Sequence, residues 1–245
     1  MHRFFADEKG IREGKAFLDA MDAHHAAHVL RLRPGEEIVL MSSKQPYRAV
    51  IEAVSDDGVL CRAGEALKSP EPALRITLYQ GLPKADKMEW IIQKCTEVGV
   101  AAIVPLAMTR CVSLVTDKDG PKKQERWQRI AREAAKQSGR AAVPEVSPPL
   151  SFSKAPSRLN QHEAVLVPWE EAAEVGPRDV YRQLSHVRDI ALVIGPEGGI
   201  TPEEVASMKK EAHAMPITLG PRILRTETAG LCAAAALLTL WGDMG

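Results

Sequence analysis

The sequence has few cysteines, and their placement excludes two kinds of site. Cys61, Cys95, Cys111 and Cys232 lie far apart, and no two of them share a C-x-x-C spacing. Such a set supplies neither a zinc site nor a disulfide framework. Because Cys95 and Cys232 fall on apolar positions of expected helices, we predict that the cysteines are buried thiols.

A long hydrophobic run and an excess of charge of one sign are also missing. Charged residues occur from the N-terminus onward, so we expect neither a secretory signal nor a membrane span, and a cytoplasmic protein. The 32 basic residues balance 32 acidic ones, which argues against binding of nucleic acid through bulk positive charge. At 245 residues the chain can bury a substantial core, in one large or two modest domains.

A proline-rich segment at residues 68–72 separates two different textures of sequence. Short alternating segments precede it, at 37–41, 47–53 and 58–62. They predict a small β-barrel domain over residues 1–70. After the segment, expected strands at 75–80, 102–105 and 164–168 alternate with segments of helical periodicity, at 88–98 and 121–140. This alternation predicts a parallel α/β domain over residues 71–245.

Two strand, loop and helix units follow one another in the last quarter of the chain. In the first, the apolar run at 191–194 ends in GPEGG at 195–199. Glycine tolerates positive φ and close approach, so this pattern predicts a buried strand entering a sharp loop. Thr201, Pro202 and Glu204 then form the capping box of a helix.

The second unit has a strand at 216–219 and an irregular loop at 219–225. An alanine- and leucine-rich helix at 226–241 follows, and Gly242 ends it. Ligands of open α/β sheets gather at the carboxyl ends of such strands, which points to a binding site here. A glycine-rich turn of this kind also occurs as simple connection chemistry, and neither a G-x-G-x-x-G nor a Walker lysine is present.

Polar residues in the two loops favour the binding site over the simple turn. Each loop region carries a carboxylate, Glu197 or Glu227, and the second also carries Arg222 and Arg225. None of these four side chains is needed to make a turn.

The two loops resemble the signature of the RsmE group of SPOUT RNA methyltransferases, with GPEGG at 195–199 and LGPRILRTETA at 219–229. Agreement continues at four other places in the family's order: MHRFF at 1–5, HVLRLRPG at 28–35, KCTEVGV at 94–100 and QSGR at 137–140. The resemblance therefore spans the length of the chain.

The resemblance implies a SPOUT-type parallel α/β sheet with a C-terminal trefoil knot, preceded by a PUA-like RNA-binding barrel. It further implies a homodimeric enzyme that uses S-adenosylmethionine to methylate N3 of a uridine, the U1498-type site, in 16S ribosomal RNA of the small subunit. By position, the residues that would hold the methyl donor are Val167, Pro168, Ile194, Gly195, Pro196, Gly199, Leu219, Gly220, Ile223, Leu224, Thr228 and Ala229.

Methylation at N3 of uracil sets two chemical requirements, because the N3 proton must leave and the resulting negative charge must be stabilised. Arg225 suits the stabilising role, since its guanidinium is a fixed planar cation. Glu227 or Glu197 could accept the proton. The alternative is that both glutamates only cap nearby amides, Glu227 in the first turn of its helix. The sulfonium is already activated, so no metal is needed.

Basic residues give a candidate RNA surface. On a helix through 121–140, at about 100° per residue, Lys122, Arg126, Arg129, Arg132, Lys136 and Arg140 share one arc, opposite Trp127 and Ile130. With the residues that the family motifs add, the RNA-binding candidates are Arg3, His28, Arg31, Arg33, Lys84, Lys94, Arg110, Arg126, Arg129, Lys136 and Arg140. The basic arc is equally typical of the solvated face of an ordinary amphipathic helix.

Several alternatives remain open. His24 and His28 are four apart on an expected helix but lack a third ligand, so we expect no metal site. The apolar helix at 226–241 is a candidate dimer element, with Leu231, Ala234, Ala235, Leu238 and Trp241, or it is buried within its own domain. The functional rivals are a SPOUT methyltransferase for another nucleotide of ribosomal or transfer RNA and a non-catalytic RNA-binding assembly factor. A nucleotide-dependent oxidoreductase is disfavoured by the missing dinucleotide fingerprint.

Overall fold

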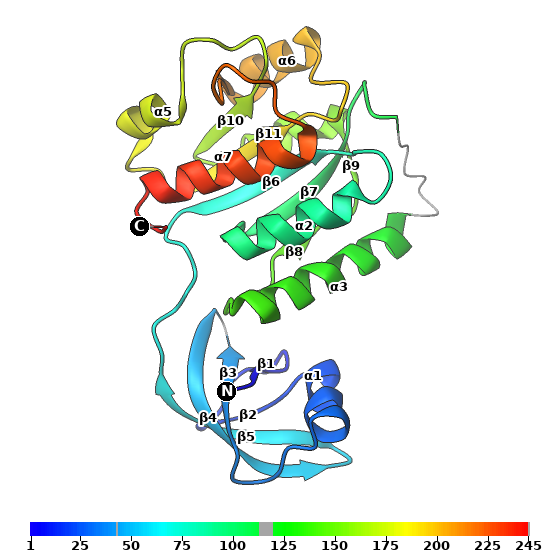
Figure 1. Ribbon diagram of the computed structural model, residues 1–245, viewed down its shortest axis with the longest axis vertical. Helices are drawn as coiled ribbons and strands as arrows, with labels where there is room; N and C mark the ends of the chain where they lie inside the picture. The colour runs from blue at the N-terminus through cyan, green and yellow to red at the C-terminus, as the bar shows by residue number, and fades with distance from the viewer. Residues whose placement is uncertain (43, 113–119, 245) are drawn as a thin grey trace. The chain divides into compact units, whose positions relative to one another are not determined.

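The computed structural model describes residues 1–42, 44–112 and 120–244 (Figure 1). The chain divides into two compact units, the first made of Met1–Glu71 with Ala135–Ala142 and the second of Pro72–Ala134 with Val143–Gly245. Sequence alone suggested a single break after residue 70. The structure adds a second segment to the N-terminal unit, because residues 135–142 bond to acidic side chains of that unit.

The N-terminal unit contains a five-stranded sheet in the order β1-β3-β4-β5-β2. The strands are β1 Arg3–Phe5, β2 Lys15–Phe17, β3 Glu37–Ser42, β4 Gln45–Ser55 and β5 Gly58–Ala66. Strand β4 pairs antiparallel with both β3 and β5, and these three strands confirm the three predicted segments. Strand β1 pairs parallel to β3. The two strands that sequence missed, β1 and β2, have three residues each, too few to show an alternating pattern.

A short helical segment lies beside this sheet, with α1 at Ala20–His24 and a π-helical turn at His25–Val29. Asp22 of α1 is fully buried and accepts a hydrogen bond from the backbone N–H of Phe5 at 2.6 Å. Lys136 reaches the same carboxylate, with 2.7 Å between its Nζ and Asp22 Oδ1. A buried carboxylate needs such a partner. Lys136, expected to contact RNA, is instead largely buried as the counter-ion of Asp22.

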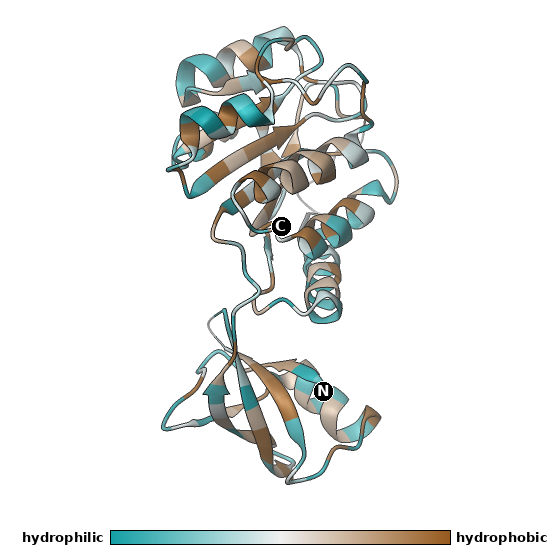
Figure 2. Cartoon of the chain, turned by 60° about the vertical axis from the view of Figure 1, so that its left-hand side comes forward, coloured by the Kyte–Doolittle hydropathy of each residue, from teal (hydrophilic) through white to brown (hydrophobic). Residues whose placement is uncertain are grey.

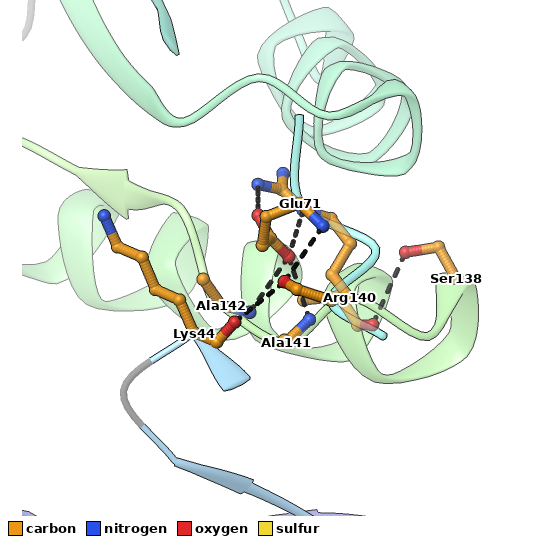
Figure 3. Close-up of polar contacts among 8 residues, drawn as sticks. Lys44, Glu71, Ser138, Arg140, Ala141 and Ala142 are labelled. Carbon is orange, nitrogen blue, oxygen red and sulfur yellow. Dashed lines mark hydrogen bonds and ion pairs between the residues drawn. The ribbon is translucent and has the colours of Figure 1, made fainter. Parts of the chain in front are cut away.

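The linker ends in a second buried ion pair, shown in Figure 3. Glu71 Oε2 lies 2.6 Å from Nη2 of Arg140, and Glu71 Oε1 accepts hydrogen bonds from the N–H groups of Ala141 and Ala142 at 2.8 and 3.1 Å. Arg140 is only 5% exposed. Its expected contact with RNA phosphate is therefore wrong, because the guanidinium is buried in an ion pair that links Glu71 to the turn after α3 (Gly120–Ser138).

The C-terminal unit is built on a seven-stranded sheet in the order β12-β10-β11-β6-β7-β8, with β9 also paired to β7. Every pairing in it is parallel. The strands are β6 Arg75–Gly81, β7 Ala102–Ala107, β8 Glu145–Val146, β9 Leu150–Ser151, β10 Ala164–Pro168, β11 Asp189–Ile194 and β12 Met215–Ile217. This confirms the predicted parallel α/β architecture of the second part of the chain.

Helices cover both faces of this sheet. The first face carries α2 Lys87–Val98, α3, α5 Pro177–Leu184 and α7 Thr226–Leu240, and Figure 1 shows α2 and α7 in front of β6. The second face carries a 3-10 turn at Phe152–Lys154, α4 Ala155–Leu159 and α6 Pro202–Ala212.

Adjacent strand residues point into opposite layers of this unit. Leu78 and Leu192 enter the core under α2 and α7, whereas Tyr79 and Val193 enter the core under α4 and α6. In Figure 2 the strands of this unit are mostly brown, while its helices carry both brown and teal. A sheet buried on both faces needs such near-continuous apolar strands.

The capping box before α6 is confirmed. Thr201 Oγ1 accepts from the Glu204 N–H at 3.2 Å, and Glu204 Oε2 accepts from the Thr201 N–H at 3.0 Å. The next strand is shorter than predicted. It ends at Ile217 because Thr218 Oγ1 accepts from the N–H of Gly220 at 3.2 Å, which turns the chain.

One prediction about the cysteines is wrong. Cys61 and Cys95 are buried, but Cys232 of α7 is exposed and Cys111 is half-buried. Helix α7 is apolar around most of its circumference, so its pattern does not reveal which side faces the sheet. The buried side carries Leu237 and Leu238. Among the described residues, no helix is long and apolar enough to cross a membrane.

Candidate active site

A cavity of about 840 Å³ lies at the carboxyl ends of β10, β11 and β12, within the size range of small-molecule sites. Its wall is formed by the end of β10 with Trp169 and Glu170, the glycine-rich loop at 195–199, the loop at 218–225, the first turn of α7, and Lys87 at the start of α2. The two loops that sequence singled out therefore face one cavity, at the edge of the sheet where ligands of α/β proteins bind.

The glycine-rich loop fits so tightly that side chains are excluded. A Cβ on Gly195 would lie 2.7 Å from Ile200 Cγ1, and one on Gly81 at the end of β6 would lie 2.5 Å from the backbone N of Pro196. Gly199 has φ +74, a conformation that other residues rarely adopt. The loop thus rests directly on β6, which fixes its backbone at the cavity wall.

A buried polar chain connects this loop to α7. The amide Nε2 of Gln80 donates to Thr226 Oγ1 at 2.9 Å, and Thr226 Oγ1 donates to the carbonyl of Gly195 at 2.6 Å. Gln80 is fully buried. Sequence reasoning missed it, although a lone amide side chain inside the apolar strand β6 is a signal that could have been followed.

Lys87 joins the two candidate carboxylates. Its Nζ lies 3.0 Å from Glu197 Oε1 and 3.3 Å from Glu227 Oε2. Hydrogen bonding to Glu197 is the main reason that the pKa of Lys87 is raised above its usual value. Nothing in the sequence pointed to Lys87, which is more than 100 positions from either glutamate. Arg225 lines the same cavity.

Ten of the twelve expected donor-binding residues line the cavity: Pro168, Ile194, Gly195, Pro196, Gly199, Leu219, Gly220, Ile223, Leu224 and Ala229. The other two lie elsewhere. Val167 is fully buried and packs in the apolar layer between the sheet and α6. Thr228 lies in the first turn of α7, outside the set of residues that form the wall.

The chain matches two families of known domains. Residues 69–238 match the family described as RNA methyltransferase domain, and residues 18–63 match the RNA methyltransferase PUA domain. The chain is 36% identical to the ribosomal RNA small subunit methyltransferase E of Bacillus subtilis, over 97% of this chain and 96% of that protein. The chain belongs to this family of RNA methyltransferases.

Two further relatives support the family assignment. The ribosomal RNA small subunit methyltransferase E of Mycobacterium bovis is 35% identical, over 96% of this chain and 90% of that protein. The solved structure of the Neisseria gonorrhoeae ribosomal RNA small subunit methyltransferase E, bound to S-adenosylmethionine, superposes with a TM-score of 0.79 at 32% identity and covers 100% of both chains.

The RNA-binding candidates of the methyltransferase unit have different surroundings. Arg110 Nη1 donates to the carbonyl of Gly198 at 2.9 Å, and a Cβ on Gly198 would lie 2.8 Å from Arg110 Cβ, so Arg110 buttresses the glycine-rich loop. Lys94 pairs with Glu97 at 2.8 Å, and Arg126 pairs with Glu89 at 2.7 Å while 56% of its side chain stays exposed. The remaining candidates, Lys84 and Arg129, are exposed.

The candidates of the PUA unit are exposed, with the exceptions of Lys136 and Arg140 described above. His28, Arg31 and Arg33 follow one another along the π-helical turn and the loop after it. The ring centroid of His28 lies 4.7 Å from that of His24, and the two rings are tilted by 44°. Among residues 1–42, 44–112 and 120–244, no three His, Cys, Asp or Glu side chains gather as metal ligands.

Proposed function

We propose that the chain transfers the methyl group of S-adenosylmethionine to N3 of a uridine, the U1498-type site, in 16S ribosomal RNA. The observation that carries this proposal is the cavity, which brings Glu197 and Arg225 together beside a backbone-lined pocket. The relative from Neisseria gonorrhoeae, solved with S-adenosylmethionine bound, supports the choice of cofactor. The resemblance of the N-terminal motif at 28–35 to the base-methylating group supports the choice of base.

The residues present fit S-adenosylmethionine. The cavity has room for a molecule of that size, and its wall combines apolar side chains, such as Ile194 and Leu219, with loop backbone held by Gly195 and Gly199. When bound there, the cofactor would supply an activated methyl group. The protein would supply orientation, which accounts for a large part of the rate in such transfers.

The chain's polar groups meet the two requirements of N3 methylation. Glu227 or Glu197 would take the N3 proton, and the Arg225 guanidinium would stabilise the charge that spreads onto the uracil oxygens. Arg225 is the residue immediately before α7, and its side chain is exposed at the cavity wall.

The test is an assay with labelled S-adenosylmethionine and small ribosomal subunits from a strain without the endogenous enzyme, followed by mass spectrometry of the nucleosides. N3-methyluridine at one site is the expected product. A different methylated nucleoside would favour another SPOUT specificity. Donor binding without transfer to free or assembled RNA, or no donor binding, would favour the RNA-binding assembly factor.

Replacing Arg225 by alanine should lower kcat about 10- to 100-fold, the usual loss for a charge-assisted hydrogen bond of about 1.5–3 kcal/mol. The expected loss falls on kcat more than on the Kd for S-adenosylmethionine, because the guanidinium acts on charge that develops during transfer. Arg225→Lys keeps the charge but not the planar fork and should recover activity only in part. Turnover of Arg225→Ala close to that of the wild type would remove Arg225 from the mechanism.

Arg129 tests the RNA surface. If exposed cations of α3 meet phosphates, RNA affinity should fall steeply with salt, and Arg129→Ala should reduce the slope of log K against log salt by about 0.7–0.9. Filter binding of a 16S RNA fragment at several salt concentrations measures the slope. Lys210→Ala, an exposed lysine of α6, is the matched control. An unchanged slope for Arg129→Ala would show that this face of α3 is exposed to solvent and does not contact RNA.

The proposal also covers the chain topology, the oligomeric state and the location of the protein. We propose a C-terminal trefoil knot, because β12 lies at the sheet edge while α7 packs on β6 and β11 in its middle, so the loop at 218–225 must carry the chain back. We also propose that two chains form a homodimer through α7, which leaves Cys232 exposed and Leu231 only partly buried. An enzyme of ribosomal RNA would work in the cytoplasm.

A further inference from the structure

The cluster of Lys87, Glu197 and Glu227 joins three separate segments, and Lys87 and Glu197 line the cavity while Glu227 lies directly behind this wall, in contact with Lys87. Lys87 begins α2, Glu197 lies in the glycine-rich loop, and Glu227 lies in the first turn of α7. The three side chains are between 20% and 32% exposed, so they are partly withdrawn from solvent. One lysine thus serves two carboxylates, and the cluster carries a net charge of −1.

The two carboxylates differ in what already binds them. Both oxygens of Glu197 accept from the backbone N–H of Lys84, at 3.1 and 3.3 Å, in addition to its contact with Lys87. Burial opposes ionisation of Glu197, yet hydrogen bonds from its own backbone, Lys87 and Lys84 hold the pKa of its carboxyl below its usual value. A carboxylate held in this way is a weak base and a good structural anchor.

Glu227 accepts fewer hydrogen bonds than Glu197 from the described residues. Its Oε2 is buried, and although Lys87 Nζ lies 3.3 Å away, that oxygen accepts no hydrogen bond from the described residues. A buried carboxylate oxygen without a hydrogen bond is costly, so this oxygen gains by accepting one from a bound substrate.

We propose that Lys87 is a positioning residue that anchors Glu197 and leaves Glu227 as the carboxylate that accepts the proton from N3. The inference rests on the proposed function. In the transfer, the N3 proton passes to Glu227, and the electron pair of the N–H bond forms the bond from N3 to the methyl carbon. The bond from that carbon to sulfur breaks, and its electrons go to sulfur.

The lysine also explains how the cluster tolerates the proton transfer. Before the transfer, Lys87 shares its charge between Glu197 and Glu227. Afterwards Glu227 is neutral, and Lys87 stays paired with Glu197, so no partly buried charge loses its partner. The lysine therefore holds the geometry of the site while the charge of the cluster changes from −1 to 0.

Two isosteric variants separate the carboxylates. Glu227→Gln should lower kcat by about 100-fold or more, the usual scale of general base catalysis, with the Kd for S-adenosylmethionine within about threefold of the wild type. Glu197→Gln should weaken donor binding about tenfold, because its loop loses an anchor, and should leave kcat at saturation within about tenfold. Glu227→Gln with near wild-type kcat, or the two patterns exchanged, would overturn the assignment.

Lys87→Met tests the positioning role through the pH profile of kcat. Removing the cation takes away an opposite charge that favours ionised carboxylates, so the acid limb of the kcat profile should move to higher pH. Lys87→Arg should restore the profile, and Lys210→Met in α6 should leave it unmoved. An acid limb that does not move in Lys87→Met contradicts the inference.

A measurement without methyl transfer keeps the two proposals apart. Carbon-13 NMR of labelled glutamate carboxyls, assigned with Glu197→Gln, should show the Glu197 signal titrating at higher pH in Lys87→Met than in the wild type, because Lys87 helps to hold the pKa of that carboxyl down. If the wild type transfers no methyl group, the proposed function fails, and the titration still decides whether Lys87 anchors Glu197. Unmoved titrations overturn its role whatever the enzyme does.

Discussion

Gly81→Ala is expected to abolish tight binding of S-adenosylmethionine. A Cβ at this position would lie 2.5 Å from the backbone N of Pro196, 2.7 Å from its Cδ and 2.8 Å from the carbonyl carbon of Gly195. These atoms are backbone or proline ring and cannot rotate away, so the glycine-rich loop must move. We expect the Kd to weaken about 10- to 100-fold, because overpacking strain of about 1–3 kcal/mol opposes the arrangement of the loop that binds the donor.

Isothermal titration calorimetry measures the Kd, and thermal unfolding measures the accompanying strain. Overpacking of this kind costs about 1–3 kcal/mol, so the variant should remain folded. Gly176→Ala is the matched control, since a Cβ there would meet its nearest atom, Asp179 Oδ2, at an ordinary 3.8 Å. A Gly81→Ala protein that binds the donor as tightly as the wild type would show that the loop is not part of the donor site.

The strands and helices around the cavity could be predicted because their signals are local. Thr201 and Glu204 mark the start of α6 within four residues, and the apolar run at 191–194 predicts β11. Local chemistry of this kind needs no knowledge of the rest of the fold. The positions of Glu197 and Arg225 beside one cavity then follow from the parallel arrangement, since the carboxyl ends of parallel strands meet at one edge.

The residues that sequence missed or misread depend on contacts between distant segments. Lys87 and Gln80 act on the cavity from α2 and β6, and neither has a neighbour in sequence that reveals its partner. Arg140 and Lys136 fall on the same helical arc as exposed Arg129, but burial depends on where Glu71 and Asp22 lie in the folded unit. Periodicity gives the face of a helix, and only tertiary structure gives its partner.

The ion pair between Glu71 and Arg140 leads to the second large effect, on stability. Glu71→Ala should lower the free energy of unfolding of the N-terminal unit by about 3–5 kcal/mol, because the buried guanidinium of Arg140 would lose the carboxylate 2.6 Å away. The same substitution removes the carboxylate oxygen that accepts hydrogen bonds from the N–H groups of Ala141 and Ala142 (Figure 3).

Urea unfolding of the full chain measures the loss, and two variants identify its cause. Glu71→Leu combined with Arg140→Met removes both charges and should cost less than Glu71→Ala alone, since the buried cation is removed together with the carboxylate. Arg48→Ala breaks an exposed pair with Glu37, 3.9 Å apart in the same unit, and should cost less than about 1 kcal/mol. If Glu71→Ala is as mild as Arg48→Ala, the segment at 135–142 is held to this unit by its apolar contacts and not by the buried ion pair.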